Sequence, residues 1–124
     1  MRNPIVACLV MCGVVAICPD EQQPLNENGH SDRLAEKYEA EREVRLQDGS
    51  RVDLLNSEYA IEVDWCTGLK WAEGCGQALL YAEMTGKKPA LLLLYKGTPE
   101  NQRCLWRARV ACARAKIRLY VEEI

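Results

Sequence analysis

Apolar and polar residues alternate with a period of two in four short stretches, which is the spacing of half-buried β-strands. The four stretches are EVRLQ (43–47), RVDLL (51–55), YAIEVDW (59–65) and KIRLYVEEI (116–124). A fifth stretch, KPALLLLYKG (88–97), is apolar almost throughout, as expected of a strand buried on both faces. Turn residues at 48–50 (DGS) and 56–58 (NSE) predict that the first three strands follow one another through tight connections.

Three further stretches have the apolar spacing and the boundary signals of helices. They run from Asp32 to about Arg42, from Lys70 to Gly86, and from Thr98 to about Arg114. A glycine such as Gly86 is suited to end a helix, and Pro99 after the capping Thr98 is suited to begin one. The predicted order α-β-β-β-α-β-α-β indicates an α/β or α+β fold, in which helices cover the faces of one sheet.

The 124 residues are enough for one domain, and the first 31 stand apart from it. After one early positive charge, residues 1–18 hold an apolar run of the length found in secretory signal peptides. Residues 19–31 are rich in Pro and Asn, as in a linker, which leaves 32–124 as the folded domain. We therefore expect an exported protein, periplasmic or secreted. A lipoprotein modified at Cys18 and a cytosolic protein with a buried N-terminal element are the alternatives.

Four cysteines follow the leader, an even number that suits an oxidising compartment. Cys104 and Cys112 are eight residues apart in an expected helix, about 12 Å along its axis, which is too far for a disulfide between them. Cys66 and Cys75 flank an expected loop and could approach each other. A zinc site is the rival interpretation, but the chain has no C-x-x-C pair and only one histidine.

Charge is unevenly distributed along the chain, although the net charge is only −2. Residues 20–64 contain thirteen acids and five bases, whereas 65–124 contain five acids and ten bases. The net charge argues against a general polyanion binder, but the basic C-terminal part could bind phosphates. Our candidates for such nucleic-acid contacts are Arg103, Arg107, Arg114 and Lys116. The alternative is a solvated helix whose arginines cover apolar surface.

Acidic residues gather at the expected ends of two neighbouring strands. Glu62 and Asp64 share one face of their strand, because strand side chains alternate, and Asp53 lies near them across a hairpin. Carboxylates that converge in this way repel one another unless a cation neutralises them. Hard oxygen ligands suit Mg²⁺ or Mn²⁺, which lower the pKa of a bound water and polarise a phosphoryl oxygen.

The helix that follows these acids carries a polar stripe. Lys70, Glu73, Gln77 and Tyr81 recur at helical spacing and share one side of it. On an isolated helix such a stripe is usually the solvent face. Beside the acids, however, Lys70 could orient or help to deprotonate a metal-bound water. The set indicates metal-assisted phosphodiester hydrolysis.

These motifs together resemble the PD-(D/E)XK nuclease superfamily, whose restriction-endonuclease-like core has the order α-β-β-β-α-β. The resemblance covers residues 32–124, with a helix and a strand added at the C-terminus. It is carried by GSRVD ending at Asp53, IEVD with Glu62, and GQALLY with Gln77 and Tyr81, which is similar to the Q-x-x-x-Y motif of RecB-like nucleases.

The resemblance also implies roles for individual residues. Asp53 and Glu62 would be metal ligands, Glu43 would be an additional acid, and Gln77 and Tyr81 would position the metal site and the DNA end. One position departs from the family pattern, because Asp64 stands where the family lysine belongs. In some members that lysine has moved to the following helix, where this chain has Lys70.

Three functions are therefore open. The first is an exported, Mg²⁺- or Mn²⁺-dependent nuclease that acts on DNA, with Asp53, Glu62, Lys70, Gln77 and Tyr81 in the catalytic site and Asp64 or Glu43 as further metal ligands. The second is a catalytically inactive nuclease fold that serves as a binding or structural module in the cell envelope. The third is a disulfide-stapled envelope protein with no nucleic-acid partner.

Overall fold

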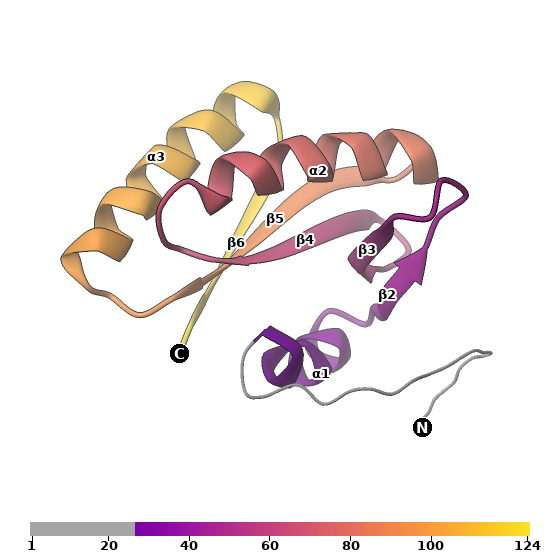
Figure 1. Ribbon diagram of the computed structural model, residues 1–124, viewed down its shortest axis with the longest axis horizontal. Helices are drawn as coiled ribbons and strands as arrows, with labels where there is room; N and C mark the ends of the chain where they lie inside the picture. The colour runs from indigo at the N-terminus through magenta and orange to yellow at the C-terminus, as the bar shows by residue number, and fades with distance from the viewer. Residues whose placement is uncertain (1–26) are drawn as a thin grey trace.

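The computed structural model describes residues 27–124, which fold into a five-stranded mixed sheet and three helices (Figure 1). The strand order in the sheet is β2-β3-β4-β5-β6. The chain is therefore a mixed α+β protein, and its element order is the predicted one. In sequence the elements are α1 (Glu27–Lys37), β2 (Glu41–Arg45), β3 (Arg51–Leu55), β4 (Tyr59–Trp65), α2 (Lys70–Thr85), β5 (Lys88–Tyr95), α3 (Pro99–Ala115) and β6 (Arg118–Glu123).

The sheet has an antiparallel half and a parallel half. The strands β2, β3 and β4 form an antiparallel meander joined by short turns. The strands β4, β5 and β6 are parallel, because α2 and α3 carry the chain back between them. The strand β4 thus belongs to both halves and occupies the centre of the sheet.

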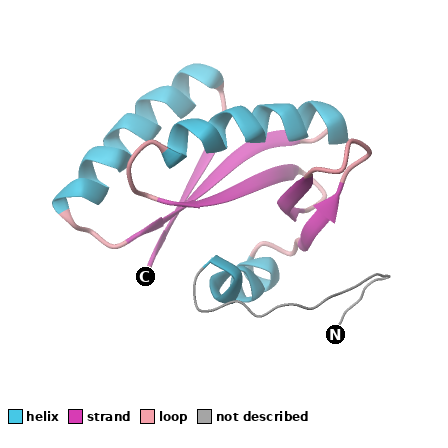
Figure 2. Ribbon diagram, in the orientation of Figure 1, coloured by secondary structure: helices cyan, strands magenta, loops and turns pink. Residues whose placement is uncertain are grey.

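Helices cover both faces of the sheet, as Figures 1 and 2 show. The helices α2 and α3 lie on one face and α1 lies on the other. The strand β5 is the shared core, since Leu91 and Leu93 pack toward α3 while Leu92 and Leu94 pack toward α1. All four leucines are fully buried, which confirms the prediction of a strand covered on both sides.

The capping signals of the two later helices are confirmed. The helix α2 ends at Gly86, which has the left-handed φ of 73°, and α3 begins at Pro99. The Thr98 side chain accepts a hydrogen bond from the Asn101 backbone N–H at 3.1 Å. These boundaries were predictable because each depends on one residue with a strong local preference.

The first helix lies earlier in the chain than predicted. The helix α1 ends at Lys37, and Arg42 belongs to strand β2 instead of the helix. Glu39 turns the chain with a φ of 51°, and Ala40 N–H donates to Ala35 O at 2.8 Å to close the helix end. A glutamate in this conformation carries no sequence signal, unlike the glycine that usually takes such a position.

A buried carboxylate attaches α1 to the sheet. Glu122 on β6 accepts hydrogen bonds from Lys37 Nζ and Tyr38 Oη, each at 2.6 Å, and lies 3.7 Å from an Arg33 nitrogen. Burial alone would raise the pKa of Glu122, but these hydrogen bonds and positive charges together lower it. The ionised form of Glu122 therefore holds the layer formed by α1 in place.

The four cysteines of the described residues are free thiols arranged as two neighbouring pairs. Cys66 lies against Cys104, and Cys75 lies against Cys112. The expected approach of Cys66 to Cys75 is not what the structure shows, because Cys66 follows β4 directly and faces α3 across the core.

Two expectations from the N-terminal sequence concern residues 1–26, which lie outside the described part of the chain. They are the leader, with its lipidation alternative, and the first part of the linker. Within residues 27–124, none of the helices combines the length and the apolar character that crossing a membrane requires.

Candidate functional site

The strands β3 and β4 separate where the two acids face each other. The pairing of the two strands ends at Leu54 and Ile61. Beyond that point Val63 N–H donates to Asp53 Oδ2 at 2.8 Å, and Asp53 N–H lies 3.4 Å from Glu62 Oε2. Carboxylates thus replace strand carbonyls as hydrogen-bond acceptors, and we call this place the acidic fork.

The strand β3 changes its alternation at the fork. Val52 packs on the α2 face of the sheet, whereas Leu54, two residues later, packs on the α1 face. In a regular strand, residues two apart share a face. The neighbouring strand β2 is distorted at the same level, where Glu43 has a φ of 48°. This irregular segment places the Asp53 carboxylate between the strands.

Glu62 is the most deeply buried acid of the fork, with only 5% of its surface exposed. Burial, followed by the negative charge of Asp53, raises its pKa to about 9, and Asp64 adds to the rise. The Asp53 backbone N–H opposes this shift only in part. Among the described residues Glu62 takes part in no ion pair. At neutral pH it therefore holds a proton unless a cation replaces it.

Asp64 lies under α2, directly against Gly74 of that helix. A Cβ atom on Gly74 would lie 2.6 Å from Asp64 Oδ2 and 2.7 Å from Leu91 Cδ1. The missing side chain of Gly74 lets the helix approach β4 closely. Asp64 lies on the same face of the strand as Glu62, because strand side chains alternate. The predicted shared face of the two acids is confirmed.

Tyr81 joins the site from the second half of α2. It is buried against Val52 and Ala60. Its pKa is raised by burial and then by the charge of Glu62, while a hydrogen bond with the Ser50 side chain opposes the rise. The Ser50 hydroxyl in turn donates to Asp48 Oδ1 at 2.5 Å. The hairpin turn, α2 and the fork are thereby connected. Of the other stripe residues, Gln77 is half-buried and Glu73 is exposed.

Lys70 and Glu43 are not brought into the fork. Lys70 is exposed at the first residue of α2, and it is not among the groups that shift the pKa of Glu62. The Glu43 carboxylate lies 3.0 Å from Arg51 and 3.5 Å from Arg42. Because Glu43 pairs with these arginines, the acids of the fork come from β3 and β4 only.

The fork offers a pair of carboxylates and not a complete set of protein ligands for a metal ion. In residues 27–124, no group of three or more His, Cys, Asp and Glu side chains is arranged to hold a metal ion. Asp53 and Glu62 form a pair, and Asp64 is engaged against α2. Mg²⁺ often binds through one or two carboxylates and completes its coordination with water and substrate phosphates. The donor set therefore fits Mg²⁺ or Mn²⁺.

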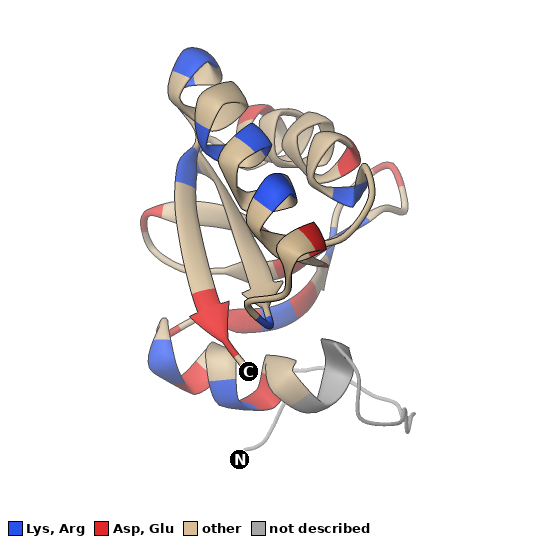
Figure 3. Ribbon diagram, turned by 90° about the vertical axis from the view of Figure 1, so that its left-hand side faces the viewer, with Lys and Arg blue, Asp and Glu red and all other residues tan. Residues whose placement is uncertain are grey.

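The expected phosphate contacts lie on the other half of the molecule. Arg103, Arg107 and Arg114 are exposed along α3, and Figure 3 shows basic residues spaced along this helix. A shallow hollow of about 520 Å³ on α3 is lined by Arg103, Arg107 and Trp106, whose surface is 67% exposed. The helix α3 packs toward β5 and β6, and the fork lies on β3 and β4. The acidic and basic groups are therefore not adjacent.

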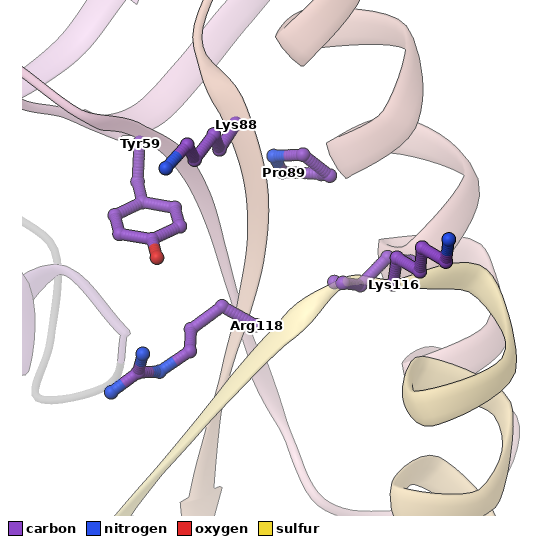
Figure 4. Close-up of a pocket in the computed structure, with 6 residues that line it drawn as sticks. Tyr59, Lys88, Pro89, Lys116 and Arg118 are labelled. Carbon is purple, nitrogen blue, oxygen red and sulfur yellow. The ribbon is translucent and has the colours of Figure 1, made fainter.

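Lys116 lies at a second hollow, of about 310 Å³, at the beginnings of β5 and β6. Figure 4 shows that its side chain extends away from that of Arg118. Arg118 stacks on Tyr120, and Lys88 pairs with Glu58 at 3.4 Å. The hollow includes no acid of the fork.

No family model, no curated protein and no solved structure matches this chain.

Three residues of the site were not predicted as functional. Ser50 and Asp48 belong to the turn DGS, which indicated only a hairpin, and Gly74 was hidden in an ordinary helix pattern. The one available signal was the glycine itself, because glycine inside a helix costs about 0.5–1 kcal/mol relative to alanine and often has a packing reason.

Proposed function

We propose that this chain is an exported, divalent-metal-dependent nuclease of the PD-(D/E)XK type, which hydrolyses phosphodiester bonds of DNA. The observation that carries the proposal is the acidic fork, where Asp53 and Glu62 meet between two diverging strands. The element order α-β-β-β-α-β over residues 27–95 is consistent with it. So is the position of Tyr81, which is buried beside the acids and within reach of their charge.

Asp53 and Glu62 would hold the ion, with Asp64 near enough to add negative charge. A bound Mg²⁺ or Mn²⁺ would supply a water of lowered pKa and polarise the phosphoryl oxygen. Glu62 must lose its proton for the ion to bind, so the protein favours binding at higher pH. Asp53 is kept in place by the Val63 N–H that donates to it.

The residues of α2 would bind and orient the substrate. Tyr81 presents a phenol that keeps its proton, and so can donate a hydrogen bond, at neutral pH. Gln77 lies one turn earlier on the same helix and is half-buried. Lys70 is exposed and would need to turn toward the fork to contact a bound phosphate. Its long, flexible side chain is able to make that movement.

A second candidate is a catalytically inactive module of the same fold. Two observations favour it: Lys70 is exposed, and the basic helix α3 is separated from the fork. Such a module would still bind a divalent ion at Asp53 and Glu62, but it would not cut DNA.

The test combines plasmid nicking with melting of the purified full chain in Mg²⁺ or Mn²⁺. A nuclease nicks the plasmid, and Asp53→Asn and Glu62→Gln each lower the rate by on the order of 10²-fold or more. Glu83→Gln is the matched control, because this acid is exposed on α2 outside the fork, and it should leave the rate unchanged.

The melting temperature separates the alternatives, because an ion that binds only the folded state must raise it. A metal-dependent rise that both fork variants abolish, without nicking, would identify the inactive module. A melting temperature that no divalent ion changes, together with intact plasmid, would exclude both metal-site functions.

A further inference from the structure

The four described cysteines form two separate pairs in the layer beneath α3. The sulfur atoms of Cys66 and Cys104 lie 2.6 Å apart, and those of Cys75 and Cys112 lie 3.7 Å apart. A disulfide bond has a length of about 2.0 Å. The two sulfur atoms of the first pair must therefore approach by about 0.6 Å to become bonded, and those of the second pair by about 1.7 Å. Each cysteine thus has one partner, and the pairing is unambiguous.

Both pairs connect the same helix to different parts of the domain. Cys104 and Cys112 lie on the buried side of α3, two turns apart. Their partners are Cys66, which directly follows β4, and Cys75 on α2. The helix α3 would therefore be attached at two points, one near its beginning and one near its end.

We propose that the mature protein contains two disulfides, Cys66–Cys104 and Cys75–Cys112, which fasten α3 covalently to β4 and α2. The proposal does not depend on the nuclease function, since none of the four residues belongs to the acidic fork. It assigns the cysteines a structural role that requires an oxidising compartment, as expected for an exported chain.

The oxidant is a disulfide, either a small-molecule one such as oxidised glutathione or that of a thiol oxidase. One protein thiolate attacks the oxidant, breaks its S–S bond and releases one thiol, which leaves a mixed disulfide. The second protein thiolate then attacks the protein sulfur of that mixed disulfide and expels the second thiol. In total, two protein thiols lose two protons and two electrons, and the oxidant gains both.

The two cysteine pairs differ in how accessible their thiols are to an oxidant in solvent. Cys75 is half-buried, whereas Cys66, Cys104 and Cys112 are buried. The hydrogen bond between Cys75 and Cys112 lowers the pKa of Cys75, which favours its thiolate. In the folded protein Cys75 therefore reacts first and Cys112 completes the bond, while Cys66–Cys104 closes as the chain folds or during slower opening.

Peptide mapping tests the pairing directly, because trypsin places each of these cysteines on a different peptide. The full chain is refolded in glutathione buffer, its remaining thiols are alkylated, and it is digested without reduction. The four peptides are 52–70, 71–87, 104–107 and 110–114, and the three N-terminal cysteines lie together on 3–33. We expect 52–70 linked to 104–107, and 71–87 linked to 110–114.

A sample oxidised in concentrated urea is the control. The four described cysteines can pair among themselves in three ways. An unfolded full chain populates all of these, together with links to the N-terminal cysteines on 3–33. The proposal is overturned if the refolded protein gives the same mixture, if 52–70 is linked to 71–87, or if the four thiols of the folded protein are all recovered alkylated.

Single variants add a second, independent check. Cys75→Ala should remove only the link between 71–87 and 110–114, and Cys104→Ala should remove only the other link. Appearance of a new pairing in either variant, with the remaining native pair lost, would contradict two separate staples.

Discussion

Glu62 is a carboxylic acid in a place that favours its neutral form. It is buried beside Asp53, and its pKa of about 9 is far above that of an exposed glutamate. A protein that needed only packing at this position would gain nothing from an acid there. The residue makes physical sense if a cation takes the place of the proton.

This raised pKa has a definite sign in the pH dependence of stability. Between about pH 4.5 and 9, the folded state keeps the Glu62 proton and the unfolded state has lost it. In the metal-free protein the free energy of unfolding should therefore fall with rising pH, by roughly 1.4 kcal/mol per pH unit from this group alone.

Glu62→Gln isolates that contribution, because glutamine does not ionise. The variant should gain stability relative to the natural protein as pH rises from 5 to 8.5, measured by urea unfolding at each pH without divalent ions. A stability difference that stays constant over this range would show that Glu62 ionises normally in the fold.

Gly74 tests how closely α2 must approach the acids. Gly74→Ala should lower the free energy of unfolding by about 1–3 kcal/mol, because the added Cβ meets Asp64 and the fully buried Leu91. Gly76→Ala is the matched control on the same helix, where a Cβ has nothing within 4 Å. It should stabilise by about 0.5–1 kcal/mol through helix propensity. Equal effects in urea unfolding would contradict the close contact.

At this scale the sequence predicted the acids but not their surroundings. The period of two placed Glu62 and Asp64 on one face, and helical spacing placed Tyr81 on the stripe beside them. The positions of the Lys70 and Glu43 side chains depend on side-chain reach, which no spacing rule includes. Glu43 pairs with Arg51 of the neighbouring strand and with Arg42 of its own strand. Cysteine pairing likewise depends on how α3 packs, so Cys66 could not be matched to Cys104 from the sequence.

Among the elements, α1 is attached mainly by an apolar face and one buried carboxylate. Leu34 is fully buried against the sheet, and Glu122 accepts hydrogen bonds from Lys37 and Tyr38. The lowered pKa of Glu122 means that its contribution is present above about pH 4.5 and is lost as pH falls through the folded-state value.

Glu122→Gln should lower the free energy of unfolding by about 1.5–3 kcal/mol at pH 7, since it weakens charge-assisted hydrogen bonds in a buried place. The cost should shrink at acid pH, once the pH has fallen through the lowered pKa of Glu122 and the natural carboxylate is itself protonated. Glu123→Gln, on the exposed side of the same strand, serves as control and should change stability little at either pH. Urea unfolding at the two pH values measures both variants. A cost for Glu122→Gln that is the same at both pH values would rule out the charged interaction.

Element boundaries were predictable where a single residue determines them. Gly86 and Pro99 bound α2 and α3 as predicted, and the strand from Tyr59 to Trp65 was predicted in full. The end of α1 was misplaced because Glu39, and not a glycine, turns the chain there.

For the whole molecule, the proposed disulfides make stability depend on the redox state. Cys66 and Cys104 are 38 positions apart in sequence, and Cys75 and Cys112 are 37 apart. Closing a loop of this length stabilises a fold by about 2–4 kcal/mol. Reduction of the oxidised protein should lower its urea midpoint accordingly. Cys75→Ala, with one disulfide, should fall between the two states. Identical midpoints before and after reduction would mean that no structural disulfide exists.

The two halves of the sheet differ in how far apart in sequence their pairing partners lie. The meander of β2, β3 and β4 pairs strands that are separated only by short turns. Pairing of β5 and of β6 instead closes a longer loop that contains a helix. During folding, the meander is therefore the segment we expect to assemble early. Asp53 and Glu62 would meet while still in water, and their desolvation would come only when α2 docks. For the proposed metal site, docking of α2 would then be the step at which the nascent protein becomes sensitive to divalent ions, and cation supply would affect how fast the chain matures.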